Sequence, residues 1–315
     1  MMETVTISKD PPPRRKKNHH NDGAGDDGAL DLVRDVVRRM EGLGKTYQRP
    51  VSLPSPFNGI WREQIIRWMY AIVNYCKLSH EAVAAASYYL DCSCVKGLVE
   101  TPHEYQLAAM SSLYLALKVF DSPAQRIIKL ESLIKLGTGR FGEEDIVSME
   151  LQIISALQWR LHPPTIACFF QQYKSVLRPL VSKKTMKSVD RESLSIIELL
   201  VSRESFLATE PSTLAFATIL VAIEKSEDID MTISQLNSFL NQMSNISSLD
   251  GSSACLNQAS QDISYALLES SSSLCPTDAE DSSTSQTHSK NEKQSLVNQP
   301  RSPSRSPTHV ISRYF

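Results

Sequence analysis

The sequence predicts an all-α protein made of two helical bundles in tandem. Apolar residues recur at helical spacing through most of residues 29–270, and the alternation typical of β-strands is nowhere sustained. The breakers His162, Pro163 and Pro164 divide this region into two stretches of similar length. A chain of 315 residues has room for two ordinary domains, and a hydrophobic content of 41% supplies a core for each.

The order of helices is expected to be similar in the two units. In the first unit, helices are expected at 59–76, 79–91, 103–120, 124–135 and 143–159. In the second unit, they are expected at 164–177, 186–205, 211–226, 232–244 and 258–269. We therefore place an N-terminal domain at 59–162 and a C-terminal domain at 163–270.

The segments that flank these domains differ from them in composition. Residues 29–58 predict an amphipathic helix and a linker, because apolar residues recur at helical spacing: Leu30, Val33, Val36, Val37 and Met40. Residues 1–28 and 271–315 are polar and lack an apolar period, which predicts disordered tails. The C-terminal tail contains Ser302 and Ser306, each followed by proline, as candidates for proline-directed phosphorylation.

Two features bear on the compartment of the protein. The sequence has no apolar run of the length that crosses a membrane, and its N-terminus does not resemble a secretory signal. The basic run at 14–17 is either a nuclear-import signal or an ordinary solvated charge run. We expect the protein in the nucleus and cytoplasm.

The Ser-, Thr- and acid-rich segment 269–288 is either a turnover signal or a solvated linker.

Composition and motifs exclude several classes of function. A net charge of −2 argues against direct nucleic-acid binding and against a membrane partner. The six cysteines include no CxxC pair, and Cys92 and Cys94 lack two further ligands, so no metal site is expected. Glycine-rich phosphate loops, HExxH and GxSxG are absent. We therefore expect no cofactor, no catalytic residues and no enzymatic activity.

One predicted helix has two apolar faces and a misplaced charge. One face comprises Trp61, Ile65, Trp68, Ile72 and Tyr75, and the other comprises Ile66, Met69 and Val73. Both faces could be core, or one could serve a partner. Arg62 lies on the second face, where an unpaired guanidinium would be costly. Asp91, near the end of the next helix, also needs a cation. We expect Arg62 and Asp91 to form a structural ion pair.

A second charge is misplaced in the helix expected at 143–159. Glu150 lies in the middle of an apolar stripe formed by Ile146, Val147, Ile153, Ile154 and Leu157. A lone carboxylate there needs a cation in its own fold, a partner protein, or both. Lys118, at the end of the almost charge-free run 105–118, is the natural candidate for the cation.

Three segments resemble the cyclin box, the helical domain of cyclins. They are WREQIIRWMYAIVNYCKLSHEAVAAASYYLDC, LAAMSSLYLALKVFDS and DIVSMELQIISALQWRLHPPT, and the last looks most similar to D-type or G1 cyclins. In the second unit, EPSTLAFATILVAI resembles a helix of the C-terminal cyclin fold. The resemblance is clear over 59–170 and weaker to about 245. It implies two tandem cyclin folds.

The resemblance implies a role for five residues. These positions, which recur as a set in cyclin boxes, are Arg62, Asp91, Leu107, Lys118 and Glu150. It implies that Lys118 and Glu150 bind a kinase, that Arg62 pairs with Asp91, and that Leu107 belongs to the core of the box. The implied function is a regulatory subunit that binds and activates a cyclin-dependent serine/threonine kinase in G1 or at G1/S.

The resemblance also implies a docking patch for substrate or inhibitor peptides. Its residues here are Trp61, Gln64, Ile65, Trp68 and Gln106. Trp61 replaces a usual methionine, Gln64 a usual apolar residue, and Ala71 an acidic residue that often pairs with the arginine of the peptide. These departures put the peptide ligand in doubt or change its type.

Two rival functions stay open at this point. A cyclin-fold transcription factor, similar to transcription factor IIB, would need a zinc ribbon and a basic face, and neither is evident in the sequence. A helical scaffold without a kinase would use Glu150 only to close an internal ion pair.

Overall fold

The computed structural model describes residues 24–120, 129–136, 139–226, 230–249 and 253–272. Every regular element of these residues is helical, which confirms the predicted all-α class. None of their helices is long and apolar enough to cross a membrane. The basic run 14–17, Ser302, Ser306 and nearly all of the two predicted tails lie outside the described residues.

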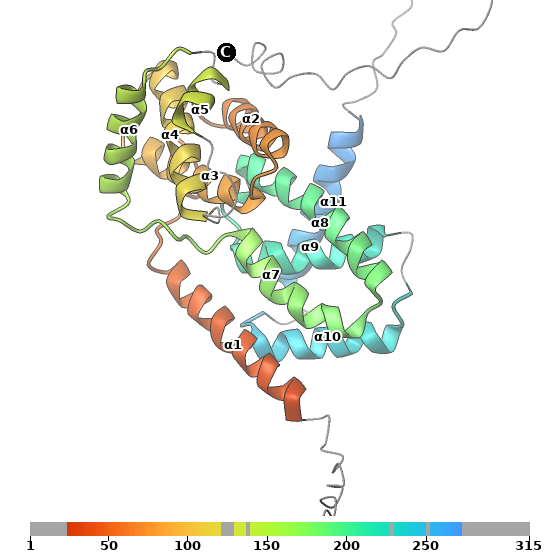
Figure 1. Cartoon of the computed structure of the whole chain (residues 1–315). Helices are drawn as coiled ribbons and strands as arrows, with labels where there is room; N and C mark the ends of the chain where they lie inside the picture. The colour runs from red at the N-terminus through yellow and green to blue at the C-terminus, as the bar shows by residue number, and fades with distance from the viewer. Residues whose placement is uncertain (1–23, 121–128, 137–138, 227–229, 250–252, 273–315) are drawn as a thin grey trace, which may run out of the picture.

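The first group of helices packs around α4. It comprises α2 (Ile60–Cys76), α3 (His80–Val95), α4 (Pro102–Phe120), α5 (Leu130–Leu136) and α6 (Glu143–Ala156), and Figure 1 shows these helices together at one end of the molecule. Helix α4 lies against both α3 and α6. Its small residues Ala108, Ala109 and Ala116 are fully buried, so neighbouring helices approach closely. The charge-free run 105–117 is therefore a central helix, as its composition predicts.

The second group packs around α9 in a similar way. It comprises α7 (Ile166–Leu177), α8 (Lys183–Ser202), α9 (Pro211–Lys225), α10 (Ile233–Ile246) and α11 (Ala254–Ser272), with short 3₁₀ turns η1 (Arg178–Leu180) and η2 (Glu204–Phe206). Helices α7, α8 and α11 all contact α9. The extended residues around Pro163 and Pro164 join the two groups. The exact domain limits at 162 and 163 stay predictions.

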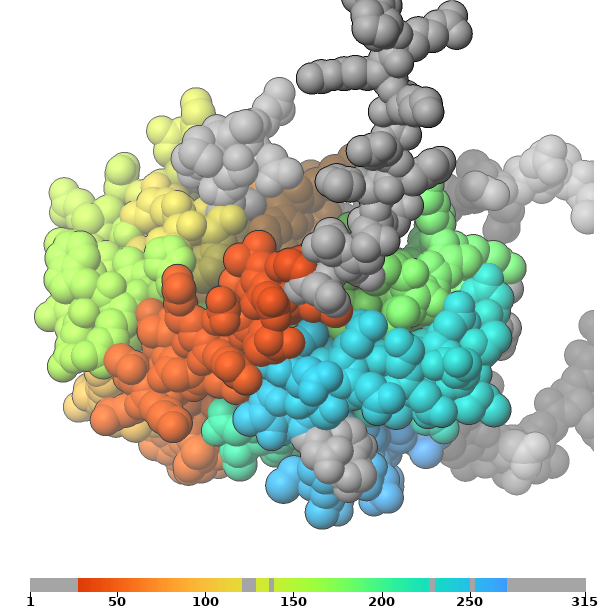
Figure 2. Space-filling model, turned by 90° about the horizontal axis from the view of Figure 1, so that it is seen from below, coloured from red at the N-terminus to blue at the C-terminus, as the bar shows by residue number. Residues whose placement is uncertain are grey.

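Helix α1 (Ala24–Gly44) packs on the second group, although it precedes the first in sequence. It lies beside α7 and α10, and Figures 1 and 2 show it next to one end of α10. Val37 is fully buried in this contact, and Arg34 Nε donates a hydrogen bond to the Asn245 carbonyl at 3.1 Å. The helix starts before the predicted limit at 29, because the low helix propensity of Gly25 and Gly28 is a weak constraint.

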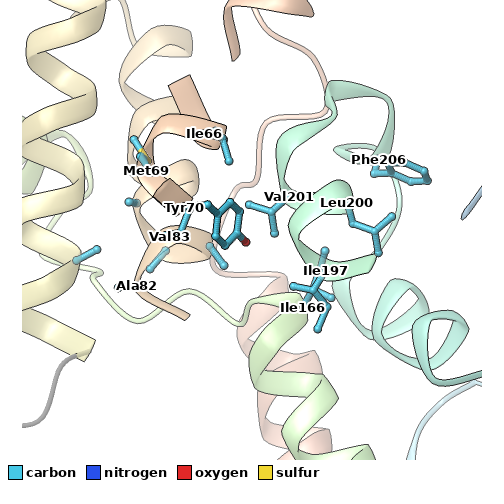
Figure 3. Close-up of a cluster of buried hydrophobic side chains, with 14 of the residues drawn as sticks. Ile66, Met69, Tyr70, Ala82, Val83, Ile166, Ile197, Leu200, Val201 and Phe206 are labelled. Atoms are coloured by element: carbon cyan, nitrogen blue, oxygen red, sulfur yellow. The ribbon is translucent and has the colours of Figure 1, made fainter. Parts of the chain in front are cut away.

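The two groups share a continuous apolar contact between α2 and α8. Figure 3 shows Ile66 and Tyr70 of α2 facing Ile197 and Val201 of α8, and all four side chains are buried. Glu204, just beyond α8, accepts hydrogen bonds from the backbone N–H groups of Leu53 at 3.0 Å and Gly59 at 2.7 Å. The linker before α2 is thus tied to the second group.

Some helix limits differ from those predicted. Helix α6 ends at Ala156 and not at 159, because Gln158 and Trp159 adopt left-handed backbone angles, with φ of 53° and 62°. The Trp159 N–H donates to the Ile154 carbonyl at 3.1 Å, which closes the helix. Helix α3 continues past the predicted end at 91 to Val95, so Asp91 lies inside it. Part of the helix predicted at 124–135 falls outside the described residues.

Candidate functional site

The structure brings Arg62 and Asp91 together in the core. Arg62 Nε lies 3.0 Å from Asp91 Oδ1, and Nη2 lies 2.9 Å from Oδ2, so the contact is bidentate. Arg62 Nη1 donates to the Val201 carbonyl at 2.7 Å. Burial by itself lowers the pKa of Arg62, but the Asp91 carboxylate offsets this effect and the pKa lies above its usual value. The pair joins α2, α3 and α8.

A second ion pair joins Lys118 and Glu150 across α4 and α6. Lys118 Nζ bonds to Glu150 Oε1, and it also lies 4.5 Å from the centroid of the Tyr114 ring. The Glu150 side chain is 8% exposed, whereas that of Lys118 is 36% exposed. Burial raises the pKa of Tyr114, and the Glu150 and Glu143 carboxylates raise it further. The pair sits at the boundary between core and solvent, with its cation on the outer side.

Apolar side chains surround this pair on the surface of α6. Val147 is 41% exposed and Leu151 is 60% exposed, one on each side of Glu150 in the sequence. The expectation that Val147 belongs to the buried stripe is wrong, since the core face of α6 is formed by Ile146, Met149, Ile153 and Ile154. The spacing of Val147 and Leu151, four residues apart, was the signal that could have revealed a second apolar face.

The predicted docking patch is only partly at the surface. Trp61 is 39% exposed and Gln64 is exposed, but Ile65 and Trp68 are buried in the core. Gln106 is also buried, and its Oε1 accepts a hydrogen bond from Arg140 at 3.3 Å. Ile65 and Trp68 therefore contribute packing beneath the patch, and the accessible part is centred on Trp61.

Two buried aromatic residues that the sequence analysis missed support Trp61 from beneath. Phe57 stacks on Tyr105 with ring centroids 4.8 Å apart, and Trp61 meets both rings edge-on. Phe57 comes from the linker, where no periodicity marks a residue as buried. Its apolar side chain next to prolines was the available signal.

The remaining predicted positions are structural. Leu107 is half-buried and packs against the core. Cys92 and Cys94 are free and buried, and burial raises the pKa of each thiol to about 12. In the part of the chain that the structure describes, no cluster of His, Cys, Asp or Glu could hold a metal ion.

Comparison with known proteins identifies the arrangement. Residues 48–162, which include both ion pairs and the Trp61 surface, match the family model for the cyclin N-terminal domain. This part of the chain is a cyclin N-terminal domain. Among solved structures, the chain is similar to a viral cyclin from herpesvirus saimiri, with a TM-score of 0.59 and 14% identity over 73% of this chain and 97% of the viral one. That likeness extends the shared fold beyond the N-terminal domain.

Curated proteins that are similar to this chain come from plants, fungi and animals. Cyclin-D3-2 of Arabidopsis thaliana is 30% identical over 111 residues, which are 35% of this chain and 30% of the relative. The G1/S-specific cyclin CLN2 of Candida albicans is 25% identical over 138 residues, 44% of this chain and 29% of the relative. The G1/S-specific cyclin-E1 of Gallus gallus is 29% identical over 117 residues, 36% and 28% of the two chains. The match spans less than a third of the length of these relatives.

Proposed function

We propose that this protein is a cyclin, a regulatory subunit that binds and activates a cyclin-dependent serine/threonine kinase. The observation that carries the proposal is the Lys118–Glu150 pair, which lies at the surface boundary beside the exposed Val147 and Leu151. Exposed apolar side chains that gather on one surface mark candidate protein-interaction sites, and an adjacent ion pair can contribute specificity. The names of the relatives, which include G1/S-specific cyclins, support the same function.

The mechanism requires the cyclin to favour the active state of the kinase. In protein kinases, a lysine on a strand and a glutamate on the regulatory helix must form an ion pair before phosphoryl transfer. A cyclin that contacts this helix only in its inward position shifts the population of the kinase toward the active state. The cyclin then contributes binding energy and no chemical step.

The geometry of the pair suits recognition of a backbone. The ammonium group of Lys118 has three donors, and the contact with Glu150 Oε1 uses one of them. The second carboxylate oxygen of Glu150 can accept from a backbone N–H group, while Lys118 donates to a carbonyl. Since the pair already fixes both side chains, less entropy is lost on binding.

Kinase capture tests the proposal directly. The tagged protein is recovered from extracts of synchronised cells, and bound kinase activity is measured beside Lys118→Glu and Glu150→Lys. Each variant should lose about 2–5 kcal/mol of binding free energy, because it leaves an unpaired charge at the interface. Gln152→Lys, exposed on the same helix but about 140° around its axis from Val147, is the matched control and should retain activity. Normal kinase binding by both single variants contradicts the assignment.

A helical scaffold is the second candidate function, and one observation favours it. Glu150 has its cation within the chain, so the pair needs no partner to be stable. The charge swap Lys118→Glu/Glu150→Lys separates the two functions. The swap rebuilds an internal pair, so a purely structural role predicts that stability returns to the wild-type level and that no variant, nor the wild type, binds a kinase. Recognition by a kinase predicts a different result. The swapped pair presents reversed charges, so the variant protein folds but does not bind or activate the kinase.

Finer aspects of the function are proposals on the same basis. We propose control of cell-cycle progression in G1 or at G1/S, in the nucleus and cytoplasm. Associated kinase activity should peak in that window, and a fluorescent fusion should appear in both compartments.

We also propose that the Trp61 surface binds substrate or inhibitor peptides. Trp61→Ala should then reduce phosphorylation of docking-dependent substrates and leave phosphorylation of a short generic peptide unchanged.

A further inference from the structure

A cavity of about 700 Å³ opens at the junction of α1, α3, α9 and the connection between the two groups. This volume lies in the range of pockets that hold a drug-sized ligand or a few residues of peptide. Its apolar walls come from segments far apart in the sequence, including Val51, Ile166, Phe169, Phe206 and Leu207. Val51 is exposed at the rim although it is apolar. The cavity is distinct from both the Lys118–Glu150 pair and the Trp61 surface.

Cations outnumber carboxylates by one among the residues that line this cavity. Arg38, Lys45 and Arg49 line it, together with the carboxylates of Glu41 and Glu210. Arg62 and Asp91 also line it but neutralise each other. Glu41 accepts hydrogen bonds from the N–H and hydroxyl of Ser248, which partly satisfy its charge. An excess of positive charge therefore faces the opening.

Of Arg38, Lys45 and Arg49, only Arg49 has a partly buried side chain. Its side chain is 23% exposed, and it forms an ion pair of 3.9 Å with Glu210, whose own side chain is 73% exposed. Burial lowers the pKa of Arg49, and the Glu210 carboxylate offsets this only in part. A guanidinium offers five N–H donors, so a half-buried one with a single long contact is suited to an incoming carboxylate.

The C-terminal part of the chain passes close to this cavity. Near the end of α11, Glu269 Oε2 accepts from Arg203 Nη1 at 2.6 Å, and Ser270 Oγ accepts from Nη2 at 3.1 Å. Arg203 directly precedes η2, and Phe206 and Leu207 form a wall of the cavity. Eight residues of extended chain span up to about 26–29 Å, so a segment soon after 272 can reach the opening.

The sequence of that segment complements the cavity. Residues 274–281 read LCPTDAED, an apolar start followed by three carboxylates, with no Lys or Arg before Lys290. The N-terminal tail fits poorly, because its run 14–17 is basic and it joins the far end of α1, about 30 Å away along a helix of this length. Charge and reach together favour the C-terminal segment.

We infer that the cavity beside Arg49 binds residues 274–281 of the same chain, with Leu274 in the apolar part and the acidic residues on Arg38, Lys45 and Arg49. A tethered segment has an effective concentration in the millimolar range, so weak contacts are sufficient for occupancy. The interaction joins the tail to the place where α1 and both helical groups meet. It is electrostatic in part and weakens as salt is raised.

Site-specific photocrosslinking in the purified full-length protein tests this inference. A photoreactive amino acid replaces Ala279, and mass spectrometry maps the products. Crosslinks to 45–51 and 206–210 are expected, with a yield independent of protein concentration. The same group at Val297 is the control and should not map to the cavity. Yield should fall about tenfold in Arg49→Glu, because like charges then face each other, and should partly persist in Arg49→Lys.

A second variant covers the case in which Arg49→Glu does not fold. Neutralising the segment with Asp278→Asn, Glu280→Gln and Asp281→Asn changes only the tail, so the fold is unaffected. Backbone amides at 45–51 should then exchange hydrogen faster than in wild type, and Glu292→Gln should have no such effect. Crosslinks elsewhere, a yield that rises with protein concentration as for a second copy, or unchanged exchange in the neutralised variant would overturn the inference.

Discussion

Arg62 donates from Nη1 to the backbone carbonyl of Val201 at 2.7 Å, which ties α2 to the end of α8. The same guanidinium is held by Asp91 through its other two nitrogens. The pair expected inside the N-terminal domain therefore also reaches across to the second group of helices. Loss of this ion pair should therefore destabilise both groups of helices.

Removal of one partner of this buried pair should be strongly destabilising. Asp91→Asn and Arg62→Ala each leave a buried group uncompensated, at an expected cost of about 3–5 kcal/mol in the free energy of unfolding. The double variant Arg62→Met/Asp91→Leu removes both charges and should lie much closer to wild type. Urea unfolding followed by circular dichroism measures the difference. Equal losses in the single and double variants would show that packing, and not charge, dominates.

The two buried tyrosines Tyr70 and Tyr89 should respond oppositely to loss of their hydroxyl groups. The Tyr70 hydroxyl is buried and has no hydrogen-bond partner among the described residues, whereas that of Tyr89 donates to the Leu161 carbonyl. Tyr70→Phe should leave stability unchanged or raise it slightly, and Tyr89→Phe should cost about 1 kcal/mol. Thermal unfolding of the two variants in one buffer provides the comparison. A loss on Tyr70→Phe as large as that on Tyr89→Phe would contradict it.

Stability should fall at alkaline pH because of the buried thiols. Burial raises the pKa of Cys92 and of Cys94 from 9.0 to about 12 in the folded protein. The folded state therefore holds the two thiol protons more tightly than the unfolded state. The contribution of the thiols to the free energy of unfolding is fully present below pH 9 and is lost as the pH rises toward 12. Between pH 8 and 10, each thiol should lower the free energy of unfolding by about 1 kcal/mol.

The double variant Cys92→Ala/Cys94→Ala measures that contribution as a shallower decline of unfolding free energy over the same pH range. The buried tyrosines also lower the free energy of unfolding at alkaline pH, so part of the decline persists in both the wild type and the double variant. Labelling gives an independent check: at pH 8 the exposed Cys255 should react with iodoacetamide while Cys92 and Cys94 stay unmodified. Rapid labelling of Cys92 in the folded protein would show that its thiol is accessible to solvent, which contradicts its burial.

The exposed apolar side chains on α6 should matter for kinase binding and little for folding. Val147→Ser/Leu151→Ser removes apolar surface that the isolated cyclin leaves in water. Kinase affinity should fall by about 1–3 kcal/mol while the free energy of unfolding changes by less than about 0.5 kcal/mol per site. Calorimetric titration with the kinase and urea unfolding of the free cyclin measure the two quantities. Leu194→Ser, exposed on α8, is the matched surface control.

The sequence by itself determined the all-α class and the residues that needed a partner. Helical periodicity is a local property, so it marked nearly all the helices, although their ends shifted by a few residues. Charges on apolar faces pointed to Arg62, Asp91, Lys118 and Glu150, because an unpaired charge in a core is costly wherever it lies.

Only the tertiary structure decided which apolar faces have a neighbour. Periodicity gave two stripes on α2, and packing against α3, α4 and α8 buries Ile65 and Trp68 while Trp61 stays partly exposed. The same applies to Val147, which a local pattern assigns to the core. The packing of α1 on α7 and α10, and the cavity at Arg49, depend on segments distant in sequence. A local pattern fixes the direction of a side chain but does not identify the element it meets.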